Sequence, residues 1–198
     1  MKNYKFGSLE NWWFRDFFLL SNLKANDIGK GIAVMKCLIA LSVLIDFKTR
    51  STDSSLSDLE FITGLSRPMV IKGLEWLNEE RIISIDKSSH VNRYTLLSHD
   101  SDDKWAKIPV NVVRKNLKGI SNRGVAPFAA LKIYLTLVSL RFKENDSVKI
   151  SHEKLREYTK IQATHVRKGL DVLYSSSMIH VVLGEERTAP EYRILGLY

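Results

Sequence analysis

The sequence predicts a mainly α-helical protein with small β-hairpins, an α+β fold that contains two copies of one unit. Residues 35–83 align with residues 131–179 at a constant offset of 96 without a gap, and 13 of the 49 pairs are identical, where unrelated segments would share only a few. Apolar residues recur at helical spacing in both copies, and each copy ends in two short β-rich runs. Because stacked solenoid repeats need at least three copies, two long copies indicate two related domains.

Length and composition fit this division. The chain has 198 residues, enough for two domains of roughly 100 residues each. No apolar run is long enough to cross a bilayer and no secretion signal is visible, so we expect a cytoplasmic protein without a membrane partner. The single cysteine, Cys37, lies in an apolar helical pattern and is expected in the core, which excludes a disulfide framework.

The net charge of +8 is unevenly spread. Residues 1–99 carry 13 basic and 11 acidic side chains, a net of +2, whereas residues 100–198 carry 17 and 11, a net of +6. An excess of basic side chains favours a polyanionic partner, and the second half is expected to contact it more.

The elements of the first copy follow from its pattern. Apolar spacing predicts a buried helix over residues 32–47. Ser55 stands three residues before Asp58, as in a capping box, and opens a short helix that Gly64 ends. The remaining expected elements are a helix over residues 67–79 and strands over residues 82–85 and 93–96.

The second copy repeats this scheme, except that Lys160 replaces the glycine of the turn. Each copy has its own lead-in segment, which begins with Trp13 or Trp105. We expect an N-terminal domain over residues 1–98 with an aromatic lead-in helix, a short acidic linker over residues 99–104, and a C-terminal domain over residues 105–198. The elements expected in the second copy are helices over residues 128–142, 152–159 and 163–174 and strands over residues 178–183 and 191–195.

The short helix, the turn at Gly64–Leu65, the next helix with Val70, Leu74 and Leu77, and the strand at Ile82–Ile83 together resemble a winged helix-turn-helix. Two such units in tandem resemble plasmid replication initiator proteins and related phage or plasmid regulators. The resemblance implies tandem winged helices that bind double-stranded DNA. In initiators the first domain tends to serve the pairing of two protein copies, while the second domain reads the DNA.

In a helix-turn-helix the second helix enters the major groove, with the residues near its N-terminus at the base edges. The polar residues that apolar spacing leaves outward there are the expected DNA contacts of the second copy: Gln162, Thr164, His165, Arg167 and Lys168. In the first copy the corresponding helix is more apolar, with Met69 and Ile71, and suits DNA or a protein surface. Its expected DNA contacts, including the wing, are Arg67, Lys72, Lys87 and Arg93.

Two further segments allow more than one interpretation. The stretch with Arg114, Lys115, Lys118 and Arg123 either tracks the DNA backbone or is a solvated loop. The N-terminal aromatic cluster is either a helix packed on the first domain or a surface for a homodimer or protein partner, since exposed aromatic patches mark interfaces. Its candidate contact residues are Trp12, Trp13, Phe17 and Phe18.

The sequence contains no phosphate-binding glycine loop, no Cys/His set at zinc spacing and no nucleophile motif, so we expect no cofactor, no metal and no enzymatic activity. The main hypothesis is a double-stranded DNA-binding protein, a replication initiator or transcriptional regulator of a bacterial plasmid or phage. The alternative is a protein–protein interaction scaffold of winged helices without sequence-specific DNA binding.

Overall fold

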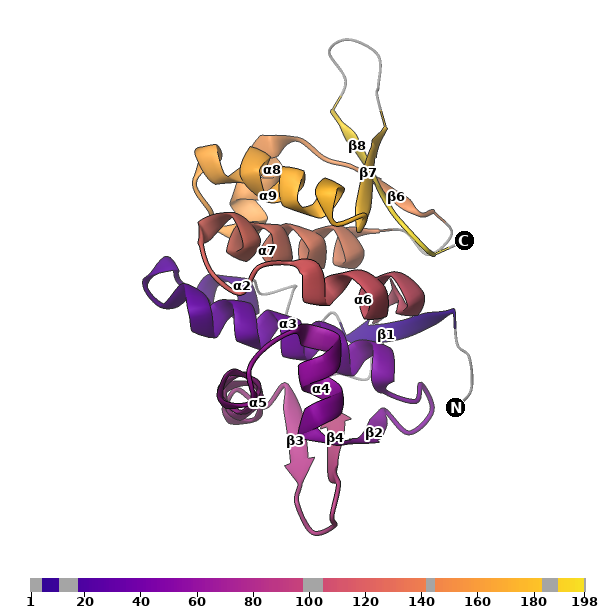
Figure 1. Ribbon diagram of the computed structural model, residues 1–198. Helices are drawn as coiled ribbons and strands as arrows, with labels where there is room; N and C mark the ends of the chain where they lie inside the picture. Colours follow the sequence, from indigo (N-terminus) through magenta and orange to yellow (C-terminus); the bar gives the residue numbers. More distant parts are fainter. Residues whose placement is uncertain (1–4, 11–17, 98–104, 142–144, 183–188, 198) are drawn as a thin grey trace.

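The computed structural model describes residues 5–10, 18–97, 105–141, 145–182 and 189–197, so the predicted linker over residues 99–104 lies outside the described chain. The protein has an α+β fold of helices and small antiparallel sheets, in which the two halves repeat one order of elements (Figure 1). We refer to residues 28–97 and 125–197 as the first and second repeats, and to residues 5–27 and 105–124 as their lead-ins.

The elements of the first half are β1 (Phe6–Glu10), α2 (Phe18–Asn22), the 3-10 helix η1 (Ala25–Asp27), α3 (Ile28–Leu44), β2 (Ser51–Ser54), α4 (Leu56–Thr63), α5 (Arg67–Glu79), β3 (Ile83–Asp86) and β4 (Asn92–Leu96). Those of the second half are β5 (Trp105–Pro109), α6 (Val110–Asn116), the 3-10 helix η2 (Leu117–Gly119), α7 (Val125–Leu140), β6 (Ser147–Lys149), α8 (His152–Thr159), α9 (Ala163–Ser175), β7 (Ile179–Val182) and β8 (Glu191–Ile194). The strand orders β2-β4-β3 and β6-β8-β7 are equivalent.

Local sequence signals place the helices of the turn where they were predicted. Ser55 and Asp58 form the reciprocal capping box of α4, and Gly64 ends that helix at φ 66°. Lys160 adopts φ 53° at the equivalent position, a left-handed conformation that a side chain makes less favourable. The long helix α3 begins at Ile28 instead of residue 32 because Asp27 accepts a hydrogen bond from the Lys30 amide and caps it.

The predicted two-stranded hairpins are wrong in one respect, because each is the larger part of a three-stranded sheet. β2 and β6 pair with β4 and β8, on the side opposite to β3 and β7. Their sequences, Ser-Thr-Asp-Ser and Ser-Val-Lys, lack a run of apolar β-formers. Backbone pairing with a distant strand, which no local pattern records, creates them.

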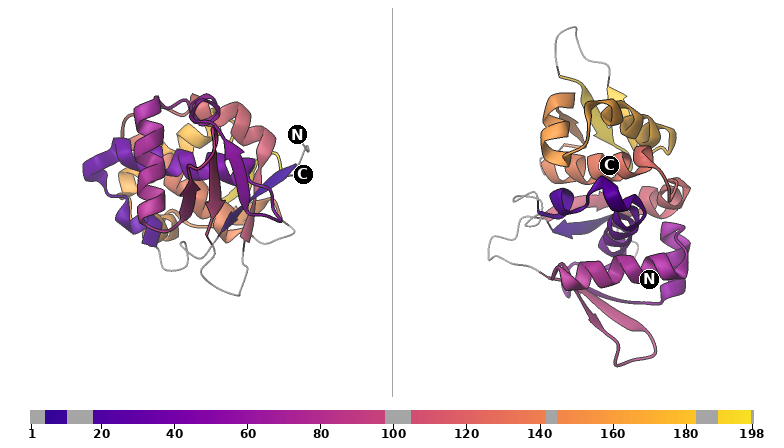
Figure 2. Two further views of the ribbon diagram at one scale, coloured as in Figure 1. Left: turned by 90° about the horizontal axis from the view of Figure 1, so that it is seen from below. Right: turned by 90° about the vertical axis from the view of Figure 1, so that its left-hand side faces the viewer.

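The helices stack in the order α5, α3, α7, α9, and α3 and α7 lie in the middle in Figure 1 and in the right-hand view of Figure 2. α3 is buried along Gly31–Val43 and α7 along Pro127–Val138. β1 and β5 form an antiparallel ribbon that joins the two halves, with Leu9, Ala106 and Ile108 buried. One continuous apolar core therefore runs through both repeats.

Each lead-in contacts the opposite repeat. α6 and η2 of the second lead-in lie against α3 and α4 of the first repeat, and α2 of the first lead-in lies against α8 of the second. At the helix turn, Asn122 donates to the Gly64 carbonyl oxygen at 2.6 Å, and a Cβ on Gly64 would stand 2.9 Å from the Lys118 carbonyl oxygen. The helices α2 and α6 and the 3-10 helix η2 thus pack on the opposite repeat, whereas β1 and η1 contact α3, and β5 contacts α7, in their own halves.

Two buried lysines at equivalent positions of the repeats, Lys36 and Lys132, hydrogen-bond to the lead-in of the opposite half. The ammonium of Lys36 donates to the Thr63 and Ile120 carbonyl oxygens and to Oδ1 of Asn122. The ammonium of Lys132 donates to the Thr159 carbonyl oxygen, at 3.0 Å, and to that of Leu20, at 2.6 Å. Each lysine joins the end of its own short helix to the lead-in of the other half, and burial lowers the pKa of both to about 8.

Replacing Lys36 or Lys132 by methionine should lower the free energy of unfolding by about 1–3 kcal/mol, because buried carbonyl oxygens lose their donor while the apolar stem keeps its volume. Loss of the buried charge offsets part of this cost. Urea denaturation measures the change, and Lys24→Met, on an exposed side chain, is the matched control. Wild-type stability in both core variants would show that these lysines do not hold the halves together.

Candidate nucleic-acid interface

The helices α5 and α9 are held against α3 and α7 by equivalent glycines. A Cβ on Gly169 would stand 2.9 Å from the Ala130 amide nitrogen, and one on Gly73 would stand 2.9 Å from the Ala33 carbonyl oxygen. Both glycines therefore permit a close backbone approach, which fixes the height and rotation of the outer helix on its support. This steric requirement explains why both repeats have glycine at this position.

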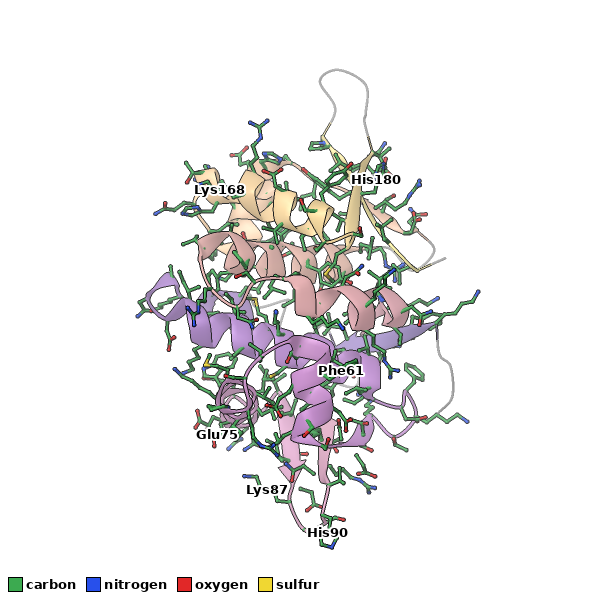
Figure 3. All side chains as sticks on the ribbon, in the orientation of Figure 1. Phe61, Glu75, Lys87, His90, Lys168 and His180 are labelled. Atoms are coloured by element: carbon green, nitrogen blue, oxygen red, sulfur yellow. The ribbon has the colours of Figure 1, made fainter. Side chains whose placement is uncertain are left out.

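The outer face of α9 carries most of the side chains predicted to contact DNA. Gln162, at the N-cap, and Thr164, Arg167 and Lys168 are exposed, whereas His165 is half-buried and its Nδ1 has no hydrogen-bond partner within the described residues. Arg167 and Lys168 make no ion pair with any described carboxylate, and Lys168 lies at the outer surface in Figure 3. Four side chains, two of them cationic, thus share one accessible face.

The predicted contacts of the first repeat are arranged differently, since three of the four are paired. Arg67 lies 3.7 Å from Glu60, and Lys72 lies 3.4 Å from Asp27. Arg93 donates two hydrogen bonds to Asp53, at 2.7 and 2.9 Å, and these lower the pKa of that carboxyl. Lys87 is exposed near the tip of the β3–β4 hairpin (Figure 3).

All three of these carboxylates have basic counterparts in the second repeat, at the offset of 96 residues. Arg156 replaces Glu60, Arg123 replaces Asp27 and Lys149 replaces Asp53. The three basic side chains are exposed. The cross-strand pair Asp53–Arg93 thereby becomes Lys149–Glu191, with the charges exchanged. Such ion pairs contribute little stability, but exchanging acid for base changes the local field.

The two surfaces lie at opposite ends of the molecule. α5 with the β3–β4 hairpin forms the first end, and α9 with the β7–β8 hairpin forms the second end (Figures 1 and 2). α3 and α7 lie between them. Lys87 and His90 therefore stand far from Lys168 and His180, as Figure 3 shows. The predicted site residues fall into two separate groups, not one site.

Neither a known protein family nor a curated protein matches this chain. Within the described residues, no group of three His, Cys, Asp or Glu side chains could hold a metal ion, and no helix has the length and apolar character to span a membrane. The function of this surface must therefore be inferred from its geometry and charge.

The predicted aromatic surface lies mostly outside the described residues. Trp12, Trp13 and Phe17 lie outside the described residues, and Phe18 is described only as the first residue of α2. The aromatic partner surface stays a prediction.

Two basic residues of the second repeat, Lys149 and Arg156, were not predicted from the sequence. The signal that identifies them is a basic residue in one copy that aligns with an acidic residue in the other. Its importance becomes clear from the ion pairs that these acidic residues form in the first repeat.

Gly169→Ala should lower the free energy of unfolding by about 1–3 kcal/mol, because the new methyl group would displace α9 from α7. Thermal denaturation tests this. The matched control is Gly119→Ala, since a Cβ there meets no atom within 4 Å. If Gly169→Ala is as stable as the control, the close approach does not constrain the helix.

Proposed function

We propose that this protein binds double-stranded DNA through its second end, with α9 as the recognition helix and the β7–β8 hairpin as the wing of the second of two winged helix-turn-helix units. The exchange of Glu60, Asp27 and Asp53 for Arg156, Arg123 and Lys149 carries the proposal. In the first half each of these carboxylates neutralises a basic side chain, whereas Arg156 and Arg123 of the second half add positive charge; Lys149 remains paired with Glu191. Unpaired positive charge attracts phosphate, so the second end suits DNA better on the same framework.

The residues on α9 suit base readout. Gln162 can form two hydrogen bonds with adenine, and Arg167 or Lys168 can do so with guanine, from an exposed helix N-terminus of the kind that enters a major groove. The exposed basic residues around them suit phosphate contacts, which orient a protein on the duplex without reading sequence. Replication initiation or transcriptional regulation on a plasmid or phage is the biological role that this architecture suggests.

The first end favours a second candidate function, protein binding. The cationic side chains of α5, Arg67 and Lys72, are paired, whereas Arg167 and Lys168 of α9 pair with no described carboxylate. Ile71 of α5 is 37% exposed where the second repeat has Arg167. An apolar residue surrounded by paired charges is more typical of a protein contact than of base recognition. The two ends would then serve different partners.

Arg167→Ala and Lys168→Ala should each weaken DNA binding by about 1–3 kcal/mol if the side chain reads a base, and by less if it contacts phosphate only. Fluorescence anisotropy on fragments selected from a random duplex pool, repeated across a salt series, gives both affinity and salt dependence. Arg67→Ala and Lys72→Ala are the matched controls at the first end and should bind like wild type. Equal losses at both ends would contradict the assignment to the second end, and absence of binding by wild type at low salt would refute DNA binding.

Restoring the charges of the first repeat should also weaken binding. We expect Arg123→Asp combined with Arg156→Glu to lower the affinity for specific and unrelated duplexes alike, because both substitutions act on phosphate. The control, Lys48→Glu combined with Lys87→Glu, makes the same change of net charge on exposed residues of the first repeat. If the control loses as much affinity in the same anisotropy assay, overall charge and not the second end governs binding.

A further inference from the structure

A groove of about 570 Å³ lies beside the proposed recognition helix, between the C-terminal half of α9 and the strands β7 and β8. Tyr174 and His180 form one part of its lining, and Arg193 and Asp171 contribute to the rest. Tyr174 is 56% exposed, and its ring centroid lies 6.2 Å from that of His180. His180 lies at the second end of the molecule in Figure 3.

The strand pairing places Arg193 directly opposite His180, so the two side chains stand next to each other on the sheet. Arg193 is ion-paired, as Arg93 is in the first repeat: its Nε lies 3.3 Å from Asp146, and its side chain stays 50% exposed. An imidazole, a guanidinium and a phenol thus line one groove, and all three are side chains that donate hydrogen bonds to phosphate oxygens.

The first repeat shows what this place looks like without these groups. The equivalents of Tyr174 and His180, at the offset of 96, are Asn78 and Ser84, and the residue paired with Ser84 is Thr95. All three of these residues are small and uncharged. Asp171 does not distinguish the ends, because its equivalent is Glu75. The aromatic and basic groups of the groove are therefore specific to the second repeat, like the exchanged charges around α9.

We propose that this groove binds the sugar–phosphate backbone of one DNA strand, with Arg193 and His180 at a phosphate and Tyr174 against the adjoining sugar. The inference rests on the proposed function and extends its contact surface from the N-terminal half of α9 to the helix–wing junction. A duplex whose major groove holds the N-terminal half of α9 has one strand passing between that helix and the wing, where the groove lies. The contact orients the duplex and reads no bases.

The test replaces each residue by its counterpart from the first repeat: Tyr174→Asn, His180→Ser and Arg193→Thr, singly and together. The triple variant should weaken binding to a selected duplex and to an unrelated one by the same factor. It should lower the slope of log affinity against log salt by about 1, the signature of one lost cationic contact to phosphate, that of Arg193. Asn78→Ala with Ser84→Ala, at the equivalent place of the first repeat, is the control. Thermal melting checks that each variant is folded.

The outcomes separate this inference from the proposed function. If the triple variant keeps the wild-type affinity and salt slope while Arg167→Ala loses affinity, the groove does not bind the backbone and the DNA-binding proposal stands. A loss confined to the selected duplex would also overturn the inference, since it would indicate base reading. Absence of wild-type binding to any duplex would refute both. If Arg193→Thr melts early because Asp146 loses its partner, His180→Ser and Tyr174→Asn alone decide the question.

Discussion

The arrangement of this protein depends on the contact between α3 and α7. Both helices are buried on every side, and a helix that is apolar all round is stable only when other elements cover it completely. α5, α4, α6 and β1 cover part of α3, and α7 packs on another side of it. α9, α8, β5 and α3 cover α7 in the same way. Neither repeat completes a core by itself, so the two outer ends are held at fixed positions by a shared interior.

An apolar contact of this kind is weakly directional, and the buried lysines give it a register. Each lysine sits on a central helix, and its stem passes through the core to carbonyl oxygens at a helix end and in the opposite lead-in. Sliding α3 along α7 would leave an ammonium and several carbonyl oxygens buried without partners, at a cost that apolar contacts would not repay. The hydrogen bonds therefore select one of the many arrangements that burial of α3 and α7 alone would allow.

Features that depend on interactions between residues close in the sequence could be predicted, whereas features that depend on contacts between distant residues could not. The bounds of α4 and α5 were predictable because the Ser55 cap, Gly64 and the spacing of Val70, Leu74 and Leu77 are local signals. The strands β1, β2, β5 and β6 and the packing of α2, α6 and η2 on the opposite repeat were not, because distant contacts create them. Lys36 stands in an apolar run, where a lysine usually indicates a solvated edge, so its burial was hidden. Among the candidate site residues, exposure on α9 was predictable from spacing, whereas the pairing of Arg67, Lys72 and Arg93 required the folded chain.

The repeat separates what the framework requires from what the surface is used for. Of the 13 identical pairs, only Lys72/Lys168 is exposed in both copies; the others are buried or half-buried. Arg123, Lys149 and Arg156, the basic residues that replace the three carboxylates, are by contrast exposed. Two ends built alike can thus carry different chemistry at no cost to the core. Because α3 and α7 lie between them, a duplex bound at the second end would leave the first end accessible. The proposed DNA site and the proposed protein contact would therefore not compete for one surface.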